Sequence, residues 1–167
     1  HLVARVPVKH GSATVEKIAI NAVMAGALPI HMPLLIAGTK ALEEHPEWWH
    51  AAATMVSVAP CWVVNGPIRH DINIISGRSL FSSGMLSNVV IPRAMYLIIR
   101  NIGGVFRPGV DTMSWYGHEA MYTLAFGENE EESPWNPLHV DHGLKKEDSA
   151  ISLFFVSGSC AALHPKN

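Results

Sequence analysis

The sequence has few charged residues for its length. Only 16% of its 167 residues are Asp, Glu, Lys or Arg, whereas hydrophobic residues make up 49%. Soluble domains typically carry about 25% charged residues. The low charge predicts apolar surface that is buried outside a single domain core, in a subunit interface or against a partner domain. We therefore expect residues 1–167 to form one domain that is a fragment or subunit of a larger assembly, a homo- or hetero-oligomer.

Long apolar runs, clustered basic residues and cysteine motifs are also missing. No uninterrupted apolar run reaches the roughly 18 residues of a membrane-spanning helix, so we expect no membrane span. The net charge is −2 and Lys and Arg are dispersed, which argues against nucleic acid as a partner. Cys61 and Cys160 are the only cysteines and form no CxxC pair, so the sequence has no zinc knuckle or dithiol motif. The expected location is the cytoplasm.

Three segments have the pattern of apolar helices. Residues 12–26 place apolar side chains at helical spacing between a Ser or Thr cap and a terminal glycine. Residues 33–44 begin with proline, which suits the first turn of a helix. Residues 87–104 are strongly apolar and end at two glycines. Together these segments predict about three apolar helices.

The remaining regular segments have the composition of β-strands. They are residues 55–65, with a break expected at Pro60, and residues 120–130, 137–141 and 149–158. Because helices come first and strands last, we predict an α+β fold, a layered domain with a mixed or antiparallel sheet.

Carboxylates and histidines are concentrated in residues 128–143, ENEEESPWNPLHVDHG. If the two predicted strands on either side of its prolines pair, alternate side chains of each strand would share a face. Four side chains would then converge at one end of the sheet: Glu128, Glu130, His139 and Asp141. Two carboxylates with one or two histidines suit a divalent metal ion, and a carboxylate beside a histidine suits proton transfer. The alternative is a solvated acidic loop, which is what we expect of Glu131 and Glu132.

Polar residues outside this segment could complete a site. His118, in WYGHE, is the candidate for a second histidine. Asn65 follows a buried strand in VVNGPIR, where its amide could hold a substrate carbonyl or carboxylate or could simply form a turn. Arg93 lies in an apolar helix, where an unpaired charge is costly, so we expect it to pair with an internal carboxylate or an anionic ligand. Arg69 and Arg78 lie near a Gly/Ser-rich loop and could also contact an anion.

Five segments together resemble a known family: ATVEKIAINAVMAG, VVNGPI, RNIGG, GENEEESPWNPLHVDHG and EDSAIS. In this order they look like the C-terminal region of UGSC-family (seleno)proteins, a bacterial group, over residues 13 to 155. In that family the region follows a domain with a selenocysteine- or cysteine-containing UGSC segment, which implies redox or thiol chemistry. That domain is missing from residues 1–167, and GSC at 158–160, at the C-terminal end, repeats three of those letters by coincidence. The resemblance therefore implies that the redox nucleophile lies on another chain or has been lost.

The resemblance also adds residues to the candidate site. The polar residues that it covers are Asn21, Asn65, Arg93, Asn101, His118, Glu128, Asn129, Glu130 and His139. Where the family reads HVERG this chain reads HVDHG, so His142 stands at an arginine position and His139 is the better candidate ligand.

We expect an enzyme subunit or domain that acts on a small polar or anionic molecule, by hydrolase-like, lyase-like or thiol-linked redox chemistry. The expected catalytic residues are His139, Glu128 and His118, and the expected substrate-binding residues are Asn65, Arg93 and Asn129. A divalent metal ion, if bound, would be held by Glu128, Glu130 and His139. One alternative is a non-catalytic partner subunit that completes a catalytic chain carrying the nucleophile, and a metal-storage or sensor module is another.

Overall fold

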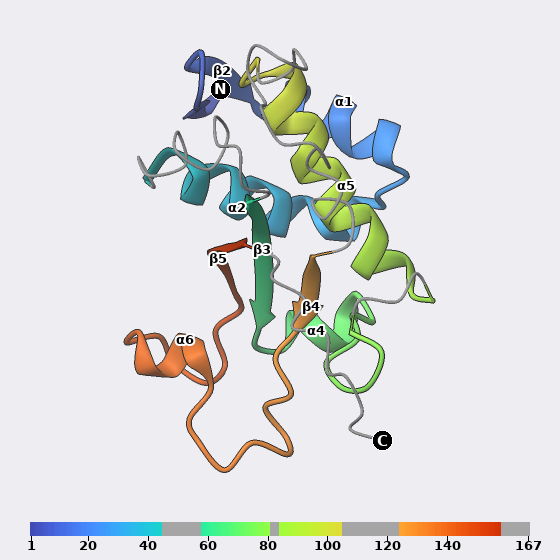
Figure 1. Ribbon diagram of the computed structural model, residues 1–167, viewed down its shortest axis with the longest axis vertical. Coiled ribbons are helices and arrows are strands. Elements are labelled where there is room, and N and C mark those ends of the chain that lie inside the picture. Colours follow the sequence, from blue (N-terminus) through green and yellow to red (C-terminus); the bar gives the residue numbers. More distant parts are fainter. Residues whose placement is uncertain (45–57, 81–83, 105–123, 158–167) are drawn as a thin grey trace, which may run out of the picture.

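Helices and strands occupy different parts of the computed structural model, which describes residues 1–44, 58–80, 84–104 and 124–157. Figure 1 shows the three long helices together at one end of the molecule, with the main sheet extending from beneath them. These helices are α1 (Val15–Ala25), α2 (Met32–Glu44) and α5 (Leu86–Asn101). The predicted α+β class with about three apolar helices is confirmed.

The main sheet has three strands, β3 (Val58–Asn65), β4 (Ala125–Gly127) and β5 (Ala150–Ser157). The central strand β3 runs parallel to β4 and antiparallel to β5, so the sheet is mixed. The break expected at Pro60 is absent, because β3 continues through this residue, which pairs with Phe155. Since β3 and β4 are parallel, they end at the same edge of the sheet, and the residues that follow them become neighbours.

The N-terminal hairpin was not predicted from the sequence. It consists of β1 (Leu2–Val6) and β2 (Gly11–Thr14), which pair antiparallel, and β1 packs against α2. Thr14 then caps α1 by accepting the Lys17 N–H at 3.2 Å, and Gly26 ends this helix at φ 84°. Both ends of α1 are those that the capping residues predict.

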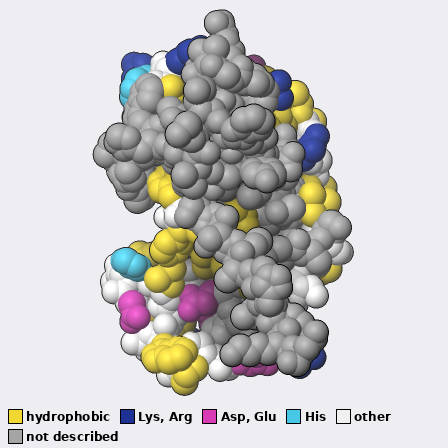
Figure 2. Space-filling model, in the orientation of Figure 1, with side chains coloured by type: hydrophobic (Ala, Val, Ile, Leu, Met, Phe, Trp, Pro, Cys, Tyr) yellow, Lys and Arg dark blue, Asp and Glu magenta, His cyan; other side chains and the backbone are white. Residues whose placement is uncertain are grey.

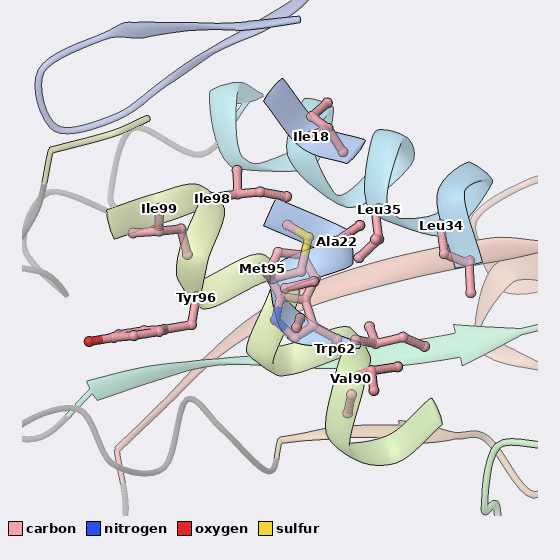
Figure 3. Packing of buried hydrophobic residues seen from close by; sticks show 14 of the residues in the cluster. Ile18, Ala22, Leu34, Leu35, Trp62, Val90, Met95, Tyr96, Ile98 and Ile99 are labelled. Atoms are coloured by element: carbon pink, nitrogen blue, oxygen red, sulfur yellow. The ribbon is translucent and has the colours of Figure 1, made fainter. Parts of the chain in front are cut away.

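The hydrophobic core lies between the helices and the main sheet. Trp62, from β3, is fully buried among side chains from the three long helices, including Ala22, Leu35 and Met95 (Figure 3). α1 packs against α5, and α2 packs against β5. Anchoring β3 through Trp62 leaves its last residues at the far end of the sheet, away from the three long helices (Figure 1).

The strand predicted over 137–141 is wrong, because Leu138–Asp141 forms a short helix, α6. Its turn is closed by the Val140 N–H, which donates to the Pro137 carbonyl at 2.9 Å. Over only five residues, the pattern of apolar and polar side chains cannot distinguish a single helical turn from a strand. The consequence is that His139 is buried and Asp141 is exposed, so the two do not share a face.

The ring of His31, at the end of a short 3-10 helix (Pro29–His31), hydrogen-bonds on both sides, to the start of its own helix and to α5. Its Nδ1 accepts the Leu28 N–H at 2.9 Å, and its Nε2 lies 3.0 Å from Ser87 Oγ. The Ser87 hydroxyl in turn donates to the Ile72 carbonyl. Because Nδ1 is an acceptor, the ring proton is on Nε2, which donates to Ser87. His31 therefore does not activate Ser87 as a nucleophile.

We expect acid to destabilise the fold through His31. Burial lowers the pKa of His31 below its ordinary value of 6.5, so the unfolded chain takes up this proton at a higher pH than the folded chain. The contribution is complete above pH 6.5 and is lost as the pH falls below it. Urea-unfolding free energies at about pH 7.5 and about pH 5.5 should differ less in His31→Gln than in the wild type. His142→Gln, at an exposed position, is the control, and an equal pH dependence in His31→Gln would contradict the assignment.

Candidate functional site

The candidate site lies where β3 and β4 end side by side. Val64 pairs with Gly127, and the Glu128 N–H continues the ladder by donating to the Val64 carbonyl at 3.0 Å. Asn65, the last residue of β3, is fully buried, and its Nδ2 donates to Glu128 Oε2 and, at 3.1 Å, to Glu130 Oε1. One amide thus joins two carboxylates that are more than sixty positions further along the chain.

Glu130 is held by donors on both carboxylate oxygens. Oε1 accepts the Gly66 N–H at 2.8 Å as well as the Asn65 amide, and Oε2 lies 3.1 Å from Nη2 of Arg69. The side chain is only 7% exposed. Glu130 is therefore a buried carboxylate with one fixed orientation.

Arg69 is the buried cation of the site, on the short helix α4 (Ile68–Asp71). Its side chain is 4% exposed and forms a fork with Glu131, with Nη2–Oε1 at 2.7 Å and Nη1–Oε2 at 3.1 Å. Burial acts to lower the pKa of Arg69, but the hydrogen bond to Glu131 and the nearby glutamate charges outweigh it and raise this pKa. The hydrogen bond from Arg69 in turn lowers the pKa of Glu131 to about 2. Glu131 is half-exposed but paired, so the expectation of a merely solvated side chain is only partly met.

Glu128 links the sheet edge to α6. Its Oε2 accepts both the Asn65 amide and, at 2.9 Å, the N–H of Leu138, the first residue of α6. The next residue is His139, whose side chain the short helix directs into the protein interior. Glu128 therefore fixes the segment that carries the buried histidine.

The imidazole ring of His139 has no hydrogen bond to any described residue. The side chain is 1% exposed, and Nδ1 lies 4.0 Å from Glu130 Oε1, which is too long for a hydrogen bond. Nε2 and the Oδ1 atom of Asn65 are also buried without a partner in the described part of the chain. A buried polar atom without a partner costs about 1–3 kcal/mol, so such atoms are uncommon in proteins.

The residues predicted for the site do not all lie together. Glu128, Glu130, His139 and Asn65 form one cluster, at the end of the molecule where Figure 2 shows acidic side chains reaching the surface. His118 lies outside the described residues.

Arg93 and Asn129 are the other two residues predicted to bind the substrate. Arg93 is exposed on α5, so the premise that it is a buried charge is wrong. Among the described residues, the buried guanidinium is that of Arg69, for which the sequence indicated only a contact to an anion. The side chain of Asn129 donates to Glu132 Oε2 at 2.7 Å, in an exposed contact.

Two further asparagines lie elsewhere. Asn101 Nδ2 donates to Asn21 Oδ1 at 2.7 Å, which joins α5 to α1. Asn21 Nδ2 donates to the Lys17 carbonyl at 2.8 Å. These contacts give Asn21 and Asn101 a role in helix packing. His142 and Asp141 are exposed.

The proposed metal ligands are occupied by protein donors. Glu130 accepts N–H groups of Asn65 and Gly66, and Glu128 accepts those of Asn65 and Leu138. Within residues 1–44, 58–80, 84–104 and 124–157, no three His, Cys, Asp or Glu side chains are arranged to hold a metal ion. The metal site stays a prediction.

Comparisons with known proteins identified no relative of this chain. No family model, curated protein or solved structure matches the chain. The resemblance to UGSC-family proteins therefore stays a prediction. Among the described helices, none is both long and apolar enough to cross a membrane.

Proposed function

We propose that this chain is an enzyme subunit or domain that acts on a small polar molecule by general acid–base catalysis at the Asn65–Glu128–Glu130–His139 cluster. The observation that carries the proposal is His139, a buried imidazole with both nitrogens unpaired among the described residues. Imidazole is the side chain best suited to exchange protons near neutral pH. A carboxylate 4.0 Å away, Glu130, would stabilise the imidazolium that forms when His139 takes a proton.

Each residue of the cluster has a distinct part in this proposal. His139 accepts and returns the proton. Glu130, fixed by Asn65, Gly66 and Arg69, is a positioning residue that acts through His139. Glu128 and the Oδ1 atom of Asn65 contact the substrate.

We also propose a reaction type, a cellular location and an oligomeric state for the chain. Proton transfer of this kind serves hydrolytic and lyase reactions. A thiol-linked redox step would need the nucleophile of a partner chain, as the resemblance to UGSC-family proteins implies. We propose a bacterial, cytoplasmic protein that works in an oligomer. His118, Arg93, Asn129 and a divalent metal ion remain candidates for added roles.

A metabolite-depletion assay tests the acid–base proposal. The purified chain is incubated with a mixture of small polar metabolites, and each compound is followed by mass spectrometry. We expect the rate of loss of at least one compound to fall about 100-fold or more in His139→Gln, the usual contribution of a general acid–base. His142→Gln, three residues further on and exposed, should keep the wild-type rate. Loss of the compound at an undiminished rate in His139→Gln would overturn the proposal.

A second candidate function is that of a non-catalytic partner subunit. It is favoured by an apolar surface on α1, where Ile20, Val23 and Met24 are exposed, Val23 to 74%. In the same depletion assay this candidate predicts no loss of any compound with the chain alone. Loss would then require a second polypeptide that co-purifies with the chain from its source.

A further inference from the structure

We infer that the group of the substrate held by this cluster is a cationic hydrogen-bond donor, an ammonium or guanidinium group, and not a carboxylate or phosphate. This inference rests on the proposed function, because it assumes that the cluster is a substrate site. It adds the chemical class of the ligand, for which the sequence had left polar and anionic molecules equally open.

Arg69, the cation that contacts this cluster, is already surrounded by acceptors. A guanidinium has five N–H groups, and Arg69 donates four hydrogen bonds to acceptors of the protein. Nε donates to the Gly66 carbonyl at 3.2 Å, and Nη1 donates to the Glu128 carbonyl at 2.6 Å and to Glu131. Nη2 contacts Glu131 and Glu130. An anionic ligand would therefore have to break an existing ion pair to reach Arg69.

The charge of the cluster favours a cation. Arg69 is the one arginine or lysine contacting the three glutamates within the described ranges, namely Glu128, Glu130 and Glu131. Two other basic groups of the described chain lie at these carboxylates: His70, which is exposed and lies 3.2 Å from Glu131, and His139 itself. With neutral histidines, negative charges outnumber positive ones by two, and opposite charge is attracted most strongly in a buried setting.

The unpaired atoms of the cluster are mainly acceptors. Asn65 uses both N–H groups of its amide on Glu128 and Glu130, and because carboxylates only accept, its free atom must be Oδ1. Glu128 uses Oε2 twice, and its Oε1 receives no hydrogen bond from the described residues. A neutral His139 adds one further acceptor nitrogen. A group with several N–H donors and a positive charge matches these acceptors.

Nuclear magnetic resonance of the full chain tests this class of ligand. The probes are methylammonium chloride and guanidinium chloride at millimolar concentrations, with sodium acetate and sodium phosphate as anions, at constant ionic strength. The ring resonances of His139, assigned by their loss in His139→Gln, report on the site. We expect a saturable shift with one or both cations and none with the anions. Glu128→Gln should weaken the cation response at least tenfold, and Glu147→Gln, at an exposed position, should not.

The outcomes separate the ligand class from the site itself. A His139 shift with acetate or phosphate but with neither cation would overturn the ligand class and leave the site in place. A shift produced by Mg²⁺ or Zn²⁺ alone would also overturn it, in favour of a metal. If no probe, organic or metallic, moved the His139 resonances of the folded chain, both the ligand class and the proposed site would fail.

Discussion

Replacing Arg69 by Met is expected to lower the free energy of unfolding by about 3–5 kcal/mol, the usual cost of removing one partner from a buried ion pair. Arg69 and Glu130 are both nearly inaccessible to solvent, and Met preserves most of the aliphatic stem while deleting the charge. Glu130 would then be a buried carboxylate without its cation. Urea denaturation followed by circular dichroism measures the loss.

Two further variants make this prediction specific. Arg78→Met, at an exposed position, should change the free energy of unfolding by less than about 0.5 kcal/mol. Combining Arg69→Met with Glu130→Gln should recover part of the loss, because the second change removes the unpaired charge. Equal effects of Arg69→Met and Arg78→Met would show that the buried ion pair contributes nothing to the fold.

Gly66→Ala is expected to destabilise the protein by about 2–5 kcal/mol. The residue has φ 79°, a conformation that costs a residue with a Cβ about 1–2 kcal/mol. A Cβ here would also lie 2.0 Å from the Asp148 carbonyl oxygen and 2.9 Å from Ser149 Cα, so backbone must move, at an added cost of about 1–3 kcal/mol. The movement would displace the Gly66 N–H that holds Glu130.

Gly143→Ala is the matched control for this substitution. Gly143 has a similar φ of 88°, but an added Cβ would have no heavy atom within 4 Å. Gly143→Ala should therefore lower the free energy of unfolding only by the cost of the positive φ, about 1–2 kcal/mol. Chemical denaturation of both variants gives the difference. If the two glycines prove equally costly to replace, the close approach of Asp148 is not a constraint on the site.

The long helices could be predicted because their signals are local. The Thr14 cap and Gly26 define α1 within a few residues of its apolar stripe, without reference to the rest of the chain. The segment 137–141 could not be assigned in this way, since its single turn depends on the distant carboxylate of Glu128. The same holds for the hairpin formed by residues 2–14, which is short and packs against α2.

The grouping of Glu128, Glu130 and His139 was expected from a strand pairing that does not exist. The parallel pairing of β3 and β4 instead places Asn65 beside Glu128 and Glu130, and the Leu138 N–H bound to Glu128 holds the segment of His139. The sequence contains no signal for the register of that pairing. Arg69 and Arg93 show the same limitation. Both lie in or next to helices, and only tertiary packing decides which of the two guanidinium groups is buried.

The hydrogen bonds of Asn65 and Gly66 also oppose deamidation of Asn65. Asn-Gly sequences lose their side-chain amide readily, because the glycine nitrogen attacks the asparagine Cγ atom. Here the Gly66 nitrogen is engaged by Glu130, and the Asn65 amide is fixed between two carboxylates and shielded from water. Conversion to aspartate would replace the donor of this amide by an acceptor that faces Glu128 and Glu130. Folding therefore preserves the residue whose loss would turn two hydrogen bonds into repulsion.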